Sequence, residues 1–162
     1  MNPDRRRFGR HKELYYLLFG LLLVVWLVAT GEGLIAAGDG IFSRWQHRAF
    51  AMLCHQDPAR SFWFNGSPMA VCTRCYGIYA SLPLAWLLIP FAGRLIERIN
   101  VWAGTMLLAA VGLNILDLLG NLLGFWENTP ASRTLLGVAV GISVAAFLGA
   151  EFFLSHQQNK EE

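Results

Sequence analysis

Long uncharged apolar segments are the feature that most limits what this chain can fold into. Residues 14–29 contain no charged side chain, and the apolar stretch continues to residue 37 with Glu32 as its only charge. A helix needs roughly 20 such residues to cross the hydrocarbon core of a bilayer. Similar segments follow at residues 76–92, 101–125 and 131–154. The sequence therefore predicts an all-α integral membrane protein, a bundle of four transmembrane helices in one domain over residues 14–154.

The distribution of basic residues predicts the orientation of these helices. Five of the thirteen Lys and Arg residues lie in the basic N-terminal segment 1–13. Such clusters stay in the cytoplasm, so a protein with four spans has both termini there, including the polar tail 155–162. The expected location is the plasma or inner cell membrane. The loop 38–75 then faces outward. A cleaved signal peptide or a twin-arginine signal is the alternative for the N-terminus, and a cytoplasmic anchor is favoured.

The outward loop contains a segment with helical periodicity. Between Ile41 and Leu53 the apolar residues recur at helical spacing, and Ser43, Arg44 and His47 fall on the opposite face. We expect an amphipathic helix that lies in the membrane interface, with a short helix packed on the bundle as the alternative. In either arrangement it brings Cys54 to the membrane surface.

Small residues predict how two of the spans pack. A stripe recurs at every fourth position of the last span, formed by Gly137, Gly141, Ala145 and Gly149. Helices in lipid associate through such smooth faces, so we expect close contact with the second span, which carries Gly77 and Ser81. The same face would alternatively join two copies of the chain in a homo-oligomer.

Polar residues inside the third span indicate an internal contact. Asn114, Asp117 and Asn121 share one side of that helix. A charge within a membrane helix is tolerated when it faces a partner or a water-filled cavity. Arg133, at the start of the last span, is the expected partner of Asp117.

The chemistry-bearing residues of the chain gather in the outward loop. Cys54 is followed by His55, and Cys72 and Cys75 form a C-x-x-C pair where the second span begins. Three thiolates and an imidazole suit a tetrahedral zinc ion, so these four residues are the predicted metal ligands. The site would be structural, or would serve a membrane-embedded enzyme if water took one position. The candidate catalytic residues around it are Arg60, Arg74, Asp117 and Arg133, with Asn128 in the same polar layer.

Two other classes of function remain open from the residues alone. A C-x-x-C pair at a helix end also suits thiol–disulfide exchange, although the usual relay needs a second cysteine pair and only Cys54 is left. A membrane scaffold or assembly factor without catalysis is the third class. The lipid bilayer is the expected partner, and nothing in the sequence indicates nucleic-acid binding, because there is no phosphate-binding glycine loop.

The cysteine motif resembles that of a family of small predicted bacterial and archaeal membrane proteins, the domain of unknown function 2085. The shared pattern is Cys54-His55-Gln56, then Arg60-Ser61-Phe62, then Ala70 through Tyr79. Asp117, Asn128, Arg133 and Gly137 match a later part of it. The resemblance covers most of the chain from Cys54 onward. It implies a shared architecture, and no established activity comes with it.

Overall fold

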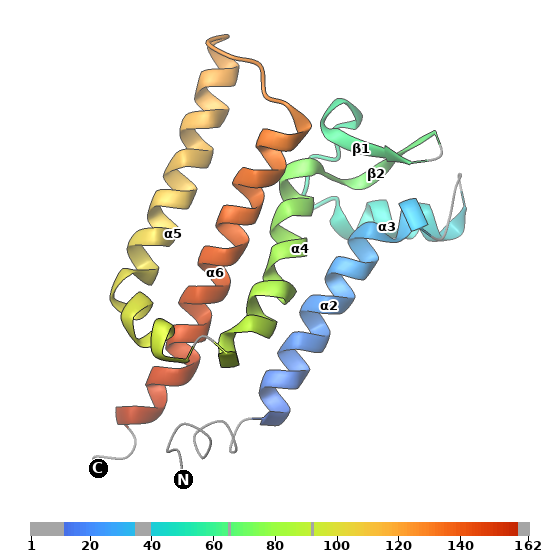
Figure 1. The fold of residues 1–162 in the computed structure, drawn as a ribbon. Helices are drawn as coiled ribbons and strands as arrows, with labels where there is room; N and C mark the ends of the chain where they lie inside the picture. The colour runs from blue at the N-terminus through green and yellow to red at the C-terminus, as the bar shows by residue number, and fades with distance from the viewer. Residues whose placement is uncertain (1–11, 35–39, 65, 92, 159–162) are drawn as a thin grey trace.

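Four long helices dominate the computed structural model, which describes residues 12–34, 40–64, 66–91 and 93–158. They are α2 (Lys12–Leu34), α4 (Thr73–Leu88), α5 (Gly93–Leu122) and α6 (Pro130–Gln158). Each runs antiparallel to the one before it, so α2 begins and α6 ends at the same end of the molecule (Figure 1). Residues 1–11 of the predicted cytoplasmic segment 1–13 and residues 159–162 of the predicted tail 155–162 lie outside the described residues, and α6 continues into the tail as far as Gln158.

Smaller elements gather at the opposite end. There, α3 (Ile41–Phe50), η1 (Pro58–Arg60), β1 (Ser61–Phe64) and β2 (Ser67–Cys72) connect α2 to α4 (Figure 1). A 3-10 turn, η2 (Ile89–Phe91), follows α4 at the other end. The molecule is mostly helical as predicted, but the two strands correct the expectation of an all-α chain.

The long helices form an open row and not a closed bundle. The row runs α2, α4, α6, α5, and its most extensive interface joins α4 to α6. Each outer helix packs mainly on one long neighbour, which leaves many large side chains exposed, among them Leu17, Leu108 and Leu116. Water disfavours such surfaces, whereas lipid accepts them.

Three of the long helices are long and apolar enough to cross a bilayer. These segments are Glu13–Gly31, Trp102–Leu122 and Pro130–Gly149. The fourth helix in the row, α4, has 16 residues and contains Pro83. The three spans agree with the predicted first, third and last membrane segments, although the first was expected to reach residue 37, beyond the described part of α2.

The interface between α4 and α6 uses the predicted stripe of small residues. A Cβ added at Gly137 would overlap the carbonyl oxygen of Arg74, and one at Gly77 would overlap that of Thr134. Ala145 is fully buried. The two backbones approach so closely because glycine places no side chain between them. The expected contact between the segment 76–92 and the last apolar segment is confirmed, because α4 packs on α6. Within one chain α4 covers the face that was the candidate oligomer surface.

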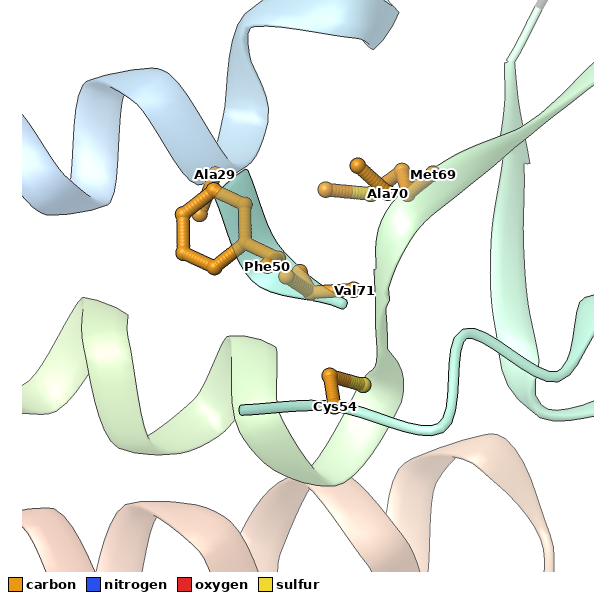
Figure 2. Packing of buried hydrophobic residues seen from close by; sticks show 6 residues of the cluster. All are labelled: Ala29, Phe50, Cys54, Met69, Ala70 and Val71. Atoms are coloured by element: carbon orange, nitrogen blue, oxygen red, sulfur yellow. The ribbon is translucent and has the colours of Figure 1, made fainter. Parts of the chain in front are cut away.

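A small hairpin covers the end of α2. Strands β1 and β2 pair antiparallel, with Ser61 opposite Cys72, and Gly66 turns the chain at a φ of 82°. Met69, Ala70 and Val71 of β2 are buried against Ala29 of α2 and Phe50 of α3, as Figure 2 shows. The sequence carries a signal for this hairpin, because Asn-Gly between apolar runs favours tight turns. The packing of the hairpin on α2 and α3 thus fixes the position at which β2 ends and α4 begins.

Candidate metal centre

Three cysteines from two segments meet at the end of the helix row. The sulfur atoms of Cys54, Cys72 and Cys75 all lie within 4.8 Å of one another. Cys54 is buried and the other two are half-buried. Tetrahedral coordination with Zn–S bonds near 2.3 Å separates two sulfurs by about 3.8 Å, so the observed spacing is close to that of a shared metal ion.

The chain after α3 places Cys54. The Cys54 N–H donates to the Phe50 carbonyl at 2.9 Å, which continues the helical direction for one more turn. Gln56 then adopts a left-handed φ of 52°, and its side-chain amide donates to the His47 carbonyl at 2.6 Å. The chain therefore turns sharply directly after Cys54 and His55. The turn directs the Cys54 side chain toward the segment that joins β2 to α4 (Figure 2).

The start of α4 places the other two thiols. Cys72 ends β2 and is the N-cap residue of α4, and Cys75 lies in the first turn of that helix. Residues three apart on a helix lie on the same side. The unpaired N–H groups and the dipole at a helix N-terminus stabilise negative charge. Hydrogen bonds to Cys54 and Cys72, together with burial, raise the pKa of Cys75 itself, so Cys75 holds its proton until a metal displaces it.

Hydrogen bonds converge on the sulfur of Cys54. The backbone N–H of Cys72 donates to it at 3.2 Å and that of Gln56 at 3.5 Å. Hydrogen bonds from the thiols of Cys72 and Cys75, reinforced by these backbone groups, hold the pKa of Cys54 well below its ordinary value, while burial acts in the opposite direction. These hydrogen bonds therefore stabilise Cys54 as a thiolate, which is the form of cysteine that binds metals.

The two remaining predictions near the cluster lie at its edge. His55 is exposed and does not belong to the group of converging ligand atoms. Its role as the fourth ligand stays a prediction. Arg60 is also exposed, and its guanidinium pairs with Asp57 at 3.0 Å within the same short turn.

Part of the polar layer, formed by Arg74, Asp117 and Asn128, comes together behind the cysteine turn. Arg74, between Cys72 and Cys75 in the sequence, forms an ion pair with Asp117 of α5. The side-chain amide of Asn128 donates to the same carboxylate oxygen at 2.7 Å, and its backbone N–H donates to Asn121. Asp117 is therefore paired with Arg74 and not with Arg133, which is half-buried at the start of α6 and forms no ion pair within the described part of the chain.

A second polar contact joins α5 to α6. The amide of Asn114 donates to the Leu136 carbonyl of α6 at 3.1 Å and to Ala110 of its own helix at 2.9 Å. The face of α5 that carries Asn114, Asp117 and Asn121 thus turns toward its neighbours in the row. The sequence predicted this shared face, but not which partner each residue meets.

Comparisons with known proteins identify a family of predicted membrane proteins. The family model described as "Predicted membrane protein (DUF2085)" matches residues 54–147, from Cys54 to within α6. The uncharacterized protein MJ1492 of Methanocaldococcus jannaschii is 30% identical over 109 residues, which cover 66% of this chain and 68% of the relative. An uncharacterized protein of Methanothermobacter thermautotrophicus is 33% identical over 98 residues, or 59% of this chain and 84% of the relative.

No solved structure matches the chain significantly. The family match spans more than half of the sequence and contains all three cysteines, the Arg74–Asp117 pair and the glycines of α6 as far as Gly141. The chain belongs to the DUF2085 family of predicted membrane proteins.

Proposed function

We propose that this membrane protein binds a divalent metal ion, zinc in the first instance, through Cys54, Cys72 and Cys75. The convergence of three sulfur atoms within 4.8 Å of one another is the observation that carries the proposal. Thiolate ligands select soft or borderline metals, and three of them in a compact set are typical of zinc. The N–H groups directed at Cys54 supply the outer hydrogen bonds that orient such ligands.

We assign a structural role to this metal. The cluster joins the end of α3 to the start of α4, and Cys54 packs in the same core as Phe50 and Val71. A metal there would fasten the hairpin to the helix row. His55 is the proposed fourth ligand, because it adjoins Cys54 in the sequence and an imidazole completes a tetrahedral set with three thiolates. With water in that position, the same centre would support hydrolysis by a membrane-embedded enzyme.

The proposed membrane arrangement has four spans. The 16-residue helix α4 rises about 24 Å, and η2 extends it toward the width of the hydrocarbon core. Its place between α2 and α6 makes it a span if its neighbours are. The basic N-terminal residues put the start of α2 in the cytoplasm, so the cysteine cluster and α3 lie at the outer face.

Metal analysis of the purified full-length protein tests the metal proposal. We expect about one zinc ion per chain, lost in Cys72→Ser and kept in Asp57→Asn, which removes an exposed carboxylate from the same loop. His55→Ala then decides whether His55 or water is the fourth ligand, because loss of zinc in this variant supports the histidine. A wild-type protein that binds neither zinc nor cobalt, although folded, contradicts the proposal.

Thiol–disulfide exchange is the second candidate, favoured by the position of Cys72 and Cys75 at a helix N-terminus. Thiol titration with and without reductant distinguishes it. A Cys72–Cys75 disulfide that forms and reduces reversibly, in a protein that binds no metal, supports exchange. If neither property is found, a scaffold role is favoured instead.

Labelling with a membrane-impermeant maleimide tests the orientation. After metal chelation, thiols at the outer face react in intact cells, whereas cytoplasmic thiols react only in inverted vesicles. We expect the first result, and labelling confined to inverted vesicles would contradict the orientation.

A further inference from the structure

Helix α3 is amphipathic in the reverse sense to a helix on a water-soluble protein. Its buried side holds the polar side chains of Ser43 and Gln46, which are 7% and 0% exposed, together with the ring of Phe50 near its end. It exposes Ile41 and Trp45, at 82% and 53%. A surface helix in water turns its apolar stripe inward. The reversed arrangement indicates that the outer side of α3 meets an apolar medium.

Contacts on the buried side hold α3 in this rotation. The amide of Gln46 donates a hydrogen bond to the Val28 carbonyl of α2. The ring of Phe50 packs against that of Tyr79 in α4, with centroids 5.5 Å apart. A rotation that buried Trp45 would break both contacts. The exposed side of α3 is therefore fixed by the fold.

The apolar surface continues past the end of the helix. Met52 is 95% exposed and Leu53 is largely exposed as well. We call the surface formed by Ile41, Phe42, Trp45, Met52 and Leu53 the α3 face. Helix α3 lies at the end of α2 that is close to the start of α4 (Figure 1). The α3 face is therefore at the same end of the molecule as the cysteine cluster.

Two positive charges lie beside this apolar surface. Arg44 and Arg48 are exposed and one helical turn apart. Interfacial helices bury apolar residues to the depth of the headgroups, and arginines at their margin contact phosphates. Trp45 suits the same depth, because its ring is apolar and its N–H is polar.

We propose that the α3 face docks on the outer leaflet of the bilayer and that Arg44 and Arg48 bind the phosphates of anionic phospholipids. The inference rests on the membrane arrangement proposed above and is independent of the metal. The docking would connect the membrane surface to the cysteine cluster, because Cys54 follows α3 within one turn. The docked helix would hold Cys54 at a set height above the membrane.

Photo-crosslinking in lipid nanodiscs tests the docking. A benzophenone amino acid replaces Ile41 or Met52 in the full-length chain, and mass spectrometry identifies the adduct. Ala59 is the control for an exposed site in the same loop, and Leu116, exposed on α5, reports membrane embedding itself. We expect phospholipid adducts at residues 41, 52 and 116 and none at 59.

The outcomes separate the inference from the arrangement on which it rests. Lipid adducts at residue 116 alone overturn the docking and leave the spans intact. Absence of lipid adducts at 116 as well overturns the membrane arrangement. An adduct at 41 or 52 with a second copy or another protein, in place of lipid, overturns the choice of partner.

The charge assignment has its own test. Nanodiscs with phosphatidylglycerol and phosphatidylcholine in equal amounts are dissolved, and native mass spectrometry counts the lipids that stay bound. Each arginine contributes about a fivefold preference for the anionic lipid, so Arg44→Gln with Arg48→Gln should remove most of it. Arg60→Gln, whose partner is Asp57, should retain it. An unchanged preference in the double variant overturns the role of the two arginines.

Discussion

The guanidinium of Arg74 pairs with the carboxylate of Asp117, and this pair joins α4 to α5 directly behind the cysteine turn. Arg74 lies between Cys72 and Cys75 in the sequence, so the three side chains start from the same turn. Those of Cys72 and Cys75 point toward Cys54, whereas that of Arg74 reaches Asp117 of α5. The Nε atom of Arg74 is buried without a hydrogen-bond partner in the described structure. Asp117 therefore supplies most of the compensation for this charge, and the turn depends on it.

Replacing Asp117 with Asn should weaken metal binding without removing a ligand. The change leaves the Arg74 charge without its counter-ion, and the first turn of α4 is then free to shift. Outer residues that orient metal ligands typically contribute about ten- to a hundredfold in affinity. Cobalt titration followed by thiolate-to-metal absorption measures this loss. Asp57→Asn is the matched control, and equal affinities in the two variants would argue against a positioning role for Asp117.

Replacing Gly137 with Ala should destabilise the protein and disturb the site. The new methyl group meets the backbone carbonyl of Arg74, which cannot move aside as a side chain end can. Overpacking of this kind costs about 1–3 kcal/mol. Thermal unfolding in detergent, followed by circular dichroism, measures the cost.

Two glycines provide controls for that experiment. A Cβ at Gly112 meets nothing within 4 Å, and one at Gly149 meets the flexible end of Ile89 at 2.7 Å. Gly112→Ala should be neutral or stabilising by up to about 1 kcal/mol, because alanine favours helix. Gly149→Ala should cost less than Gly137→Ala, because the Ile89 side chain can move. Similar losses at Gly112 and Gly137 would contradict the assignment of the Gly137 loss to the α4–α6 contact, because a Cβ at Gly112 meets no neighbour.

Replacing Tyr15 with Phe should lower stability and leave metal affinity unchanged. The hydroxyl of Tyr15 donates to the Trp86 carbonyl at 2.9 Å, and the two rings stack 5.7 Å apart. This contact joins α2 to α4 at the end of the row far from the cysteines. We expect a loss of about 1 kcal/mol in the free energy of unfolding. Tyr16→Phe, at an exposed neighbouring position, should change neither quantity, and a weakened metal affinity in Tyr15→Phe would contradict the separation of the two ends.

Replacing Asn114 with Ala should loosen α5 from α6 by a small amount. The variant loses the hydrogen bond to the Leu136 carbonyl. Hydrogen bonds between membrane helices contribute about 0.6 kcal/mol on average. Unfolding in detergent should show a loss of this size, with Thr105→Ala, an exposed position on the same helix, as the control. A loss as large as that of Gly137→Ala would not fit a single hydrogen bond.

The sequence predicted the helical segments well because each depends on local apolarity. It also predicted the α4–α6 contact, since small residues at every fourth position from Gly137 to Gly149 leave one side of a membrane helix open to close approach. The hairpin was missed even though Asn65-Gly66 lies between apolar residues, because apolar runs in a membrane protein are first interpreted as helix. The open row was missed because periodicity does not report which helices become neighbours.

The partner of Asp117 shows where pattern analysis ends. The spacing of Asn114, Asp117 and Asn121 predicts a shared face, and Arg133 at the start of the next helix is the partner that the sequence indicates. The observed partner, Arg74, reaches Asp117 from α4. Its position depends on how α4 packs on α6, where the backbone of Arg74 lies against Gly137. The relative rotation of packed helices cannot be deduced from the periodicity of any single helix.

The cysteines and the groups that brace them come from opposite halves of the chain. Cys54, Cys72 and Cys75 precede α5, whereas Asp117, Asn128 and Gly137 come from α5, α6 and the loop between them. During synthesis the complete thiol set therefore leaves the ribosome before any of its bracing residues. An ion captured at that moment would be held by a nascent hairpin and then enclosed as the later helices insert beside it.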